Sequence, residues 1–217
     1  MSAASTPSQP SLEMLGTRYP DLSPCLGDVG RAFELLKSCY EQGGKLMICG
    51  SGGSAADSEH IVGELMKGFK LKRSLPEAAR VKLTEAFPQE GAHLADQLQG
   101  ALPALSLVSQ TALITAVAND VDADLIYAQQ VYGYGRPGDA LLGISTSGNS
   151  ANILHSLRVA RTLGLHTVGL TGRGGGKMKA LCDVTICVPE DETLQIQERH
   201  LPVYHALCEL LEQAFFG

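Results

Sequence analysis

His60 and Glu64 form a pair whose residue types and spacing suggest chemistry. Apolar residues recur at helical spacing through residues 61–69, and side chains four apart lie on one face of a helix. An imidazole and a carboxylate on one face suit two ligands of one metal ion, or a general base beside the group that orients it. Either residue alone would more often be a solvated polar side chain, so the prediction rests on the pair.

A run of hydroxyl side chains follows the apolar segment 140–144. It comprises Ser145, Thr146, Ser147 and Ser150, with Gly148 and Asn149 between them. At the end of a strand and the start of a helix, such hydroxyls and the free N–H groups of the helix can surround a phosphate monoester. Any single serine here could instead cap the helix or fill a turn. The four hydroxyls together favour a phosphate site.

Two glycine-rich segments have the outline of nucleotide-binding motifs but lack the decisive residues. Residues 50–55 read G-x-G-x-x-A, yet basic residues at 70, 72 and 73 stand where an acid should bind the ribose. Residues 174–177 end in a lysine, but Met178 occupies the place of the magnesium-binding Ser or Thr. We therefore expect no nucleotide cofactor.

The apolar pattern predicts a scaffold that brings these loops together. Short apolar strands are expected at residues 46–49, 104–108, 140–144, 166–170 and 184–188. An extra N-terminal helix is expected across 29–40. Strands alternating with helices predict an α/β fold, a doubly wound parallel five-stranded sheet flanked by helices. The loops that follow the strands then meet at one edge of the sheet, where ligands bind.

The chain is expected to form one domain, because 217 residues are enough for one full-sized core and too few for two. Residues 1–24 are rich in Ser and Pro and are predicted to be a flexible tail, which leaves 25–217 as the domain. Residues 70–100 are charged, contain two prolines and interrupt the alternation of strands and helices. They predict a helical insertion to which the sequence assigns no function.

Composition excludes several classes of partner. A net charge of −6 argues against nucleic-acid binding, which needs clustered Lys and Arg. No apolar run approaches the roughly 20 residues that span a bilayer, and the N-terminus lacks the pattern of a signal peptide. A cytoplasmic protein with no membrane partner is therefore expected. Six scattered cysteines without a C-x-x-C pair predict reduced, mostly buried thiols.

In their order along the chain, these motifs resemble those of the SIS-domain (sugar isomerase) phosphoheptose isomerases. The resemblance rests on the 50–54 loop with His60 and Glu64, Asn119-Asp120, the 145–150 hydroxyl run, Thr171-Gly172 and Gln197-Glu198. It covers residues 28–70 and 103–215 and implies a flavodoxin-like SIS fold. It also implies an aldose–ketose isomerase that converts sedoheptulose 7-phosphate into D-glycero-D-manno-heptose 7-phosphate.

The same resemblance assigns roles to individual residues. The phosphate would be bound by Ser145, Thr146, Ser147 and Ser150. The sugar would be bound by Ser51, Gly52, Gly53, Ser54, Asn119, Asp120 and Gln197. A divalent metal ion, expected to be zinc, would be held by His60, Glu64, Gln197 and His205. Within that set, Glu64 would be the general base and His205 the general acid.

The chain departs from the family pattern at several points. Lys67-Gly68 replaces the usual Gly-Arg, which removes an arginine contact, and Ser51 replaces a common Asn. Gln197 and His205 are eight residues apart, about 12 Å along an ideal helix, so binding one ion needs both side chains to lean inward. Pro202 between them is expected to bend or interrupt that helix.

The resemblance further implies a homotetramer with active sites at subunit interfaces. We expect the His205 helix of one chain to face the His60 and Glu64 helix of another; the alternative is that both helices only cover the sheet of their own chain. A second function is also open, a non-catalytic SIS module that binds a sugar phosphate as a regulatory or scaffolding subunit. The joint presence of His60, Glu64, Gln197 and His205 favours the enzyme, because a binding module does not need all four.

Overall fold

A computed structural model describes residues 10–217 of the chain. Its sheet has the strands β1 (Leu46–Cys49), β2 (Ala104–Ser106), β3 (Ala140–Ile144), β4 (His166–Thr171) and β5 (Val184–Cys187). They lie in the order β2-β1-β3-β4-β5, and every neighbouring pair is parallel. This order is that of flavodoxin-like proteins, so the predicted doubly wound parallel sheet is confirmed. Only β2 is clearly shorter than expected.

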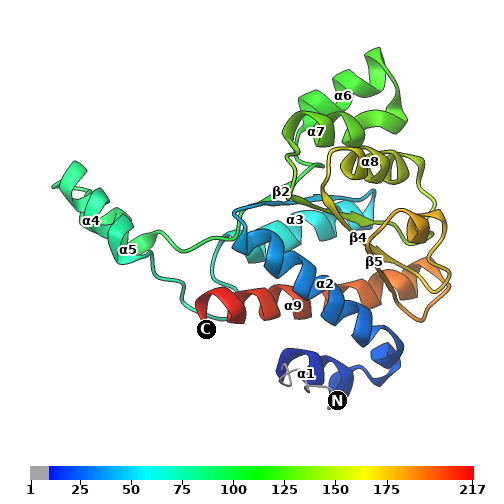
Figure 1. Cartoon of the computed structure of the whole chain (residues 1–217), viewed down its shortest axis with the longest axis horizontal. Coiled ribbons are helices and arrows are strands. Elements are labelled where there is room, and N and C mark those ends of the chain that lie inside the picture. The colour runs from blue at the N-terminus through cyan, green and yellow to red at the C-terminus, as the bar shows by residue number, and fades with distance from the viewer. Residues whose placement is uncertain (1–9) are drawn as a thin grey trace, which may run out of the picture.

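Helices cover both faces of the sheet. Figure 1 shows one layer with α2 (Leu26–Glu41), α3 (Gly53–Met66) and α9 (Thr193–Phe216), and an opposite layer with α7 (Ile126–Tyr134) and α8 (Ala151–Thr162). Helix α6 (Thr111–Asp120) and the short 3-10 helices η2 (Ala123–Leu125) and η3 (Lys177–Ala180) complete the connections. Among residues 10–217, no helix combines the length and the apolar character that crossing a bilayer requires.

The strands are largely apolar because each of their faces meets a helical layer. Ile48 and Leu142 belong to the larger core cluster, together with residues of α2 and α9. Their neighbours Met47 and Leu141 belong to the smaller cluster, together with residues of α7 and α8. This burial on both faces fixes the register of the strands, and with it the relative positions of the loops that follow them.

The N-terminal segment differs from the prediction of a flexible tail. Residues Pro10–Arg18 form α1 and Pro20–Cys25 form the 3-10 helix η1, so the prediction is wrong for this part, while residues 1–9 lie outside the described range. Leu15 and Leu22 are buried in the larger core cluster. Both prolines begin their helices, where the missing N–H breaks no intrahelical hydrogen bond.

Helix α9 runs through Pro202 without interruption, so of the bend or interruption expected there, the interruption is wrong. A proline inside a helix leaves the carbonyl four residues earlier without its donor. Here that carbonyl belongs to Glu198, an exposed residue at which water can supply a donor. His205 therefore lies on the same continuous helix as Gln197.

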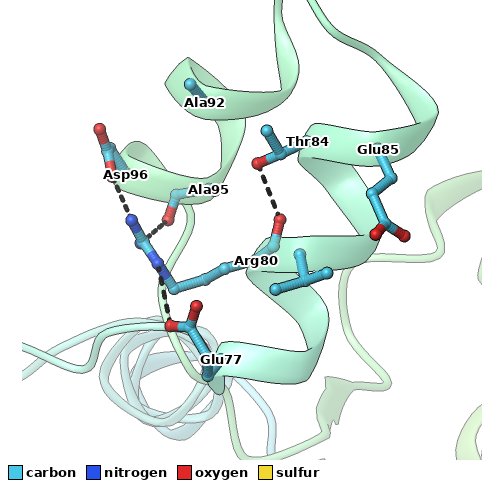
Figure 2. Close-up of a pocket in the computed structure, with 8 residues that line it drawn as sticks. Glu77, Arg80, Thr84, Glu85, Ala92, Ala95 and Asp96 are labelled. Carbon is cyan, nitrogen blue, oxygen red and sulfur yellow. Dashed lines mark hydrogen bonds and ion pairs between the residues drawn. The ribbon is translucent and has the colours of Figure 1, made fainter.

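Residues 74–99, called the arm below, stand away from the body of the protein (Figure 1). They form α4 (Glu77–Ala86), which buries none of its residues, and α5 (Gly91–Gln97). Figure 2 shows Arg80 between the two helices, where it donates to the carbonyl of Ala95 at 2.6 Å and to Oδ1 of Asp96 at 2.5 Å. At the base, an isolated antiparallel bridge pairs Ser74 with Gln99.

Candidate active site

The loops after β1 and β3 flank the point at which the strand order reverses, the usual ligand crevice of such sheets. The two loops are tied together, because Nδ2 of Asn152 at the start of α8 donates to Oγ of Ser51 at 3.2 Å. The hydroxyl of Tyr127 donates to the carbonyl of Gly50 at 2.6 Å and holds the first loop from the opposite layer. Both candidate loops therefore lie at this switch point of the sheet.

The hydroxyl loop at 145–150 has its shape fixed by the loop after β4. Gly148 has φ +63°, and a side chain there would meet the carbonyl oxygen of Gly175 at 2.3 Å, so only glycine fits. The N–H of Gly172 donates to the carbonyl of Thr146 at 3.0 Å. Oγ of Ser145 and Oγ of Ser150 lie 2.9 Å apart across the loop. These contacts preorganise the loop, which contains all four candidate phosphate-binding hydroxyls.

Gln197 lies against the first glycine loop. A Cβ on Gly53 would come within 2.6 Å of Nε2 of Gln197, so glycine at this position lets α9 approach the beginning of α3. Ser54, next to Gly53, is buried at 3% exposure, whereas Ser51 and Gly52 are exposed. The Gln197 amide therefore lies beside the loop that is expected to bind the sugar. Its contact there, Gly53, precedes His60 by about two turns of α3.

His60, Glu64 and His205 come together within one chain. Nε2 of His60 lies 3.2 Å from Oε1 of Glu64 and 3.4 Å from Nε2 of His205. Lys67 reaches the other carboxylate oxygen of Glu64 at 3.3 Å. His205 and His60 therefore meet within one chain, and the expected approach of these helices between two chains stays a prediction.

Behind this cluster, Tyr204 and Asp57 contact His60. The Tyr204 hydroxyl is 3.0 Å from Nδ1 of His60 and donates to Oδ1 of Asp57 at 3.3 Å. Burial raises the pKa of Tyr204, so its phenol stays protonated. Burial also raises the pKa of Asp57, partly offset by the Tyr204 hydrogen bond and by His60. Burial and the neighbouring His60 lower the pKa of His205, which favours its neutral ring.

The C-terminal end of α3 is fixed by a buried ion pair between Arg73 and Glu212. Arg73 donates to the carbonyls of Glu64 at 2.9 Å and Leu65 at 2.7 Å, and its Nε donates to Oε1 of Glu212 at 2.8 Å. Both charged side chains are 0% exposed. The arginine thus satisfies two carbonyls that the helix end leaves free, one of them in the backbone of Glu64.

Asn119 and Asp120 lie at the C-terminal end of α6, and both are exposed. Nδ2 of Asn119 donates to Oδ1 of Asp120 at 2.7 Å. Within residues 10–217, no hydrogen bond joins this pair to the other candidate residues. The structure therefore does not bring the pair into the His60 cluster.

The donor set of the cluster suits a zinc ion, with two imidazoles and one carboxylate. Ligands about 2.1 Å from a tetrahedral zinc ion are about 3.4 Å from each other, close to the 3.2 Å and 3.4 Å spacings around His60. In the part of the chain from 10 to 217, no three His, Cys, Asp or Glu side chains already surround one point as a metal site. Glu64 and His205 would have to turn toward a common ion.

Three residues of this region escape the sequence argument. Asp57 precedes His60 by three residues, so Asp57, His60 and Glu64 lie on one face of α3. This spacing could have been recognised in the sequence. Tyr204 lies in an apolar stretch, from which the sequence predicts only a buried core residue. Asn152 contacts Ser51 across 101 positions, a distance in sequence over which no local pattern predicts contact.

The comparisons with known proteins agree on one family. A family model described as "SIS domain" matches residues 26–100 and 79–172. The phosphoheptose isomerase of Akkermansia muciniphila is 38% identical over 203 residues, which cover 94% of each chain. The chain belongs to the phosphoheptose isomerase family. The phosphoheptose isomerase of Rhodospirillum rubrum is 41% identical to this chain over 193 residues, which cover 89% of each chain.

A solved structure of the phosphoheptose isomerase of Neisseria gonorrhoeae matches with a TM-score of 0.72 and 32% identity, over 93% of this chain and 94% of that one. The family expected from the motifs, its SIS fold and the class of sugar-phosphate isomerase are thus confirmed. A non-catalytic SIS module is not favoured, because these curated relatives carry the name of an enzyme.

Proposed function

We propose that this protein interconverts sedoheptulose 7-phosphate and D-glycero-D-manno-heptose 7-phosphate. The observation that carries the proposal is the convergence of His60, Glu64 and His205 on the helix pair α3 and α9, where α3 begins at the ligand edge of the sheet. The relatives named phosphoheptose isomerase support the choice of a heptose phosphate.

In the proposed reaction a proton moves between C1 and C2 through an enediol. Glu64 removes the proton from C1 of the ketose and returns it to C2, while His205 gives a proton to the C2 oxygen and takes one from the C1 oxygen. Such acid and base groups each contribute about 10² to 10⁴-fold. The position of His205 supports this role, because its Nε2 lies 3.4 Å from Nε2 of His60, beside Glu64.

Substrate binding in the proposal divides between the two loops at the switch point of the sheet. Ser145, Thr146, Ser147 and Ser150 bind the phosphate. The sugar is bound by Ser51, Gly52, Gly53, Ser54, Asn119, Asp120 and Gln197. Holding the phosphate in a preorganised loop fixes the reacting carbons relative to Glu64, and this positioning lowers the entropic part of the barrier.

The proposal includes a divalent metal ion held by His60, Glu64 and His205, with Gln197 as a candidate fourth ligand. Zinc suits these donors and, when bound, would polarise the substrate carbonyl. Because Gln197 lies against Gly53, its contact with the sugar is the better supported of its two roles.

We further propose a cytoplasmic homotetramer with its active sites near subunit interfaces. Val121, Tyr132 and Leu194 are 68%, 67% and 69% exposed, and apolar side chains of this size are often covered by a partner. All six cysteines are free, which suits a reducing compartment. Light scattering after size exclusion tests the assembly, with a mass four times that of the chain expected.

The activity is tested by following purified protein and sedoheptulose 7-phosphate by NMR, with and without added zinc. We expect conversion by the wild type and a kcat reduced at least about 10²-fold in Glu64→Gln, which keeps shape but cannot act as a base. Glu59→Gln on the same helix, whose carboxylate contacts Ser109, is the matched control and should retain activity. Absence of conversion by the zinc-supplemented wild type would refute the proposed function.

A further inference from the structure

Tyr204 and Asp57 form a second layer of contacts behind His60. Asp57 lies one turn before His60 on α3, and Tyr204 comes from the facing helix α9. The Tyr204 hydroxyl donates to Asp57 at 3.3 Å and lies 3.0 Å from Nδ1 of His60. The rings of His60 and Tyr204 meet edge to face, with centroids 5.5 Å apart. Tyr204 is only 2% exposed, so water competes little for its hydroxyl.

The hydrogen count of these groups determines the state of the His60 ring. A phenol carries one hydrogen, and an ionised carboxylate only accepts hydrogen bonds. Since Tyr204 gives its hydrogen to Asp57, its oxygen can only accept from Nδ1 of His60. In this arrangement Nδ1 carries the ring hydrogen, and Nε2 of the neutral ring is left with a lone pair.

That lone pair faces Glu64 at 3.2 Å and His205 at 3.4 Å. A lone pair opposite a carboxylate oxygen is repulsive unless a cation or a proton lies between them. A neutral imidazole that donates its other N–H to an oxygen is the usual form of a histidine ligand of a metal. The second layer thus prepares His60 for a cation at this point.

We propose that Tyr204 and Asp57 are positioning residues that hold His60 in its Nδ1–H tautomer and so present Nε2 to a divalent cation. The inference deepens the proposed function and rests on it only for the identity and use of the cation. Tyr204 acts through His60, and Asp57 acts through Tyr204. Removing such a partner typically lowers metal affinity 10- to 100-fold.

The tautomer can be read directly from ¹⁵N NMR of histidine-labelled, metal-free protein at alkaline pH, where the rings are neutral. The His60 signals are assigned by their loss in His60→Gln. We expect the wild type to show Nδ1–H. Asp57→Ala frees the Tyr204 hydrogen for donation to Nδ1, so His60 should switch to Nε2–H. Tyr204→Phe removes the acceptor, and the ring should move toward the Nε2–H form that imidazoles favour when unconstrained.

The matched control is Tyr40→Phe, because the Tyr40 hydroxyl is also buried but has no hydrogen-bond partner among the described residues. It should leave the His60 tautomer unchanged. A second measurement titrates zinc against a competing chelator, and we expect about 10- to 100-fold weaker binding in Tyr204→Phe and wild-type binding in Tyr40→Phe.

The outcomes separate this inference from the proposed function. An Nε2–H tautomer in the wild type, or a tautomer that stays unchanged in both Asp57→Ala and Tyr204→Phe, would overturn the inference. The expected tautomers would uphold it even if sedoheptulose 7-phosphate were not converted, because the spectra need neither substrate nor metal. Equal zinc affinity in the wild type and Tyr204→Phe would overturn the part that concerns the cation.

Discussion

Replacing Glu212 by Gln should destabilise the protein strongly, because this carboxylate accepts four hydrogen bonds at one buried point. The donors are the backbone N–H groups of Phe69 at 2.7 Å, Lys70 at 2.8 Å and Leu71 at 3.1 Å, and Nε of Arg73 at 2.8 Å. Glutamine keeps the volume but loses the charge and turns an NH₂ group toward these donors. Breaking a buried ion pair from one side costs about 3–5 kcal/mol, and we expect a loss in the free energy of unfolding of that size.

The assay is urea unfolding at a fixed protein concentration, because an oligomer's apparent stability depends on concentration. Glu209→Gln is the matched control, since Glu209 lies one turn earlier on α9 and pairs with the partly exposed Lys70 at 2.6 Å. It should cost only about 0–1 kcal/mol. The double variant Glu212→Gln with Arg73→Met should recover part of the loss, because no unpaired charge then remains buried. Equal, small effects of Glu212→Gln and Glu209→Gln would refute the reasoning.

The same residue gives a pH dependence of defined sign. Burial alone would raise the pKa of Glu212, but the hydrogen bonds from Phe69, Lys70 and Arg73 outweigh it and lower the pKa below its ordinary value of 4.5. A carboxyl with a lowered pKa in the folded state adds stability above the unfolded pKa and loses it as the pH falls through the folded pKa. The stability difference between the wild type and Glu212→Gln should therefore shrink in acid.

Three further predictions concern the proposed site. Gly148→Ala should cost about 1–3 kcal/mol in stability and raise KM, because alanine is strained at a positive φ and its Cβ would clash with Gly175. Melting curves and kinetics check this, with Gly27→Ala as the control because its Cβ would meet no atom within 4 Å. Ser147→Ala should raise KM with little change in kcat, and a fall in kcat at saturating substrate would contradict its role in binding phosphate. A strong chelator should abolish turnover and zinc should restore it, whereas full activity in protein shown to be metal-free by elemental analysis would exclude the ion from the mechanism.

Sequence predicts the central sheet well, because strands buried on both faces produce short, largely apolar runs bounded by glycine loops. It fails where tertiary contacts outweigh local signals. The Pro- and Ser-rich segment before residue 25 has a disordered composition, yet Leu15 and Leu22 fold it onto the main core. Pro202 predicts a bend or a break, yet α9 is continuous, with Glu198 exposed and Val203 and Leu207 buried in the core.

In the candidate site, too, local spacing predicts some contacts and tertiary packing determines the others. His60 and Glu64 share a helix face by spacing alone, so their proximity is predictable. The approach of His205 to His60, at 3.4 Å within one chain, depends on how α9 packs against α3, which no local pattern encodes. The role of Tyr204 depends on where its hydroxyl points, and sequence gives only its apolar surroundings.

The bridge between Ser74 and Gln99 makes the arm separable from the rest of the protein. Because its two ends lie side by side, the chain path through the sheet is the same whether a long excursion or a tight turn joins them. An evolving gene can therefore lengthen, shorten or exchange this segment without shifting any strand, and an engineer can graft a foreign domain at the same point.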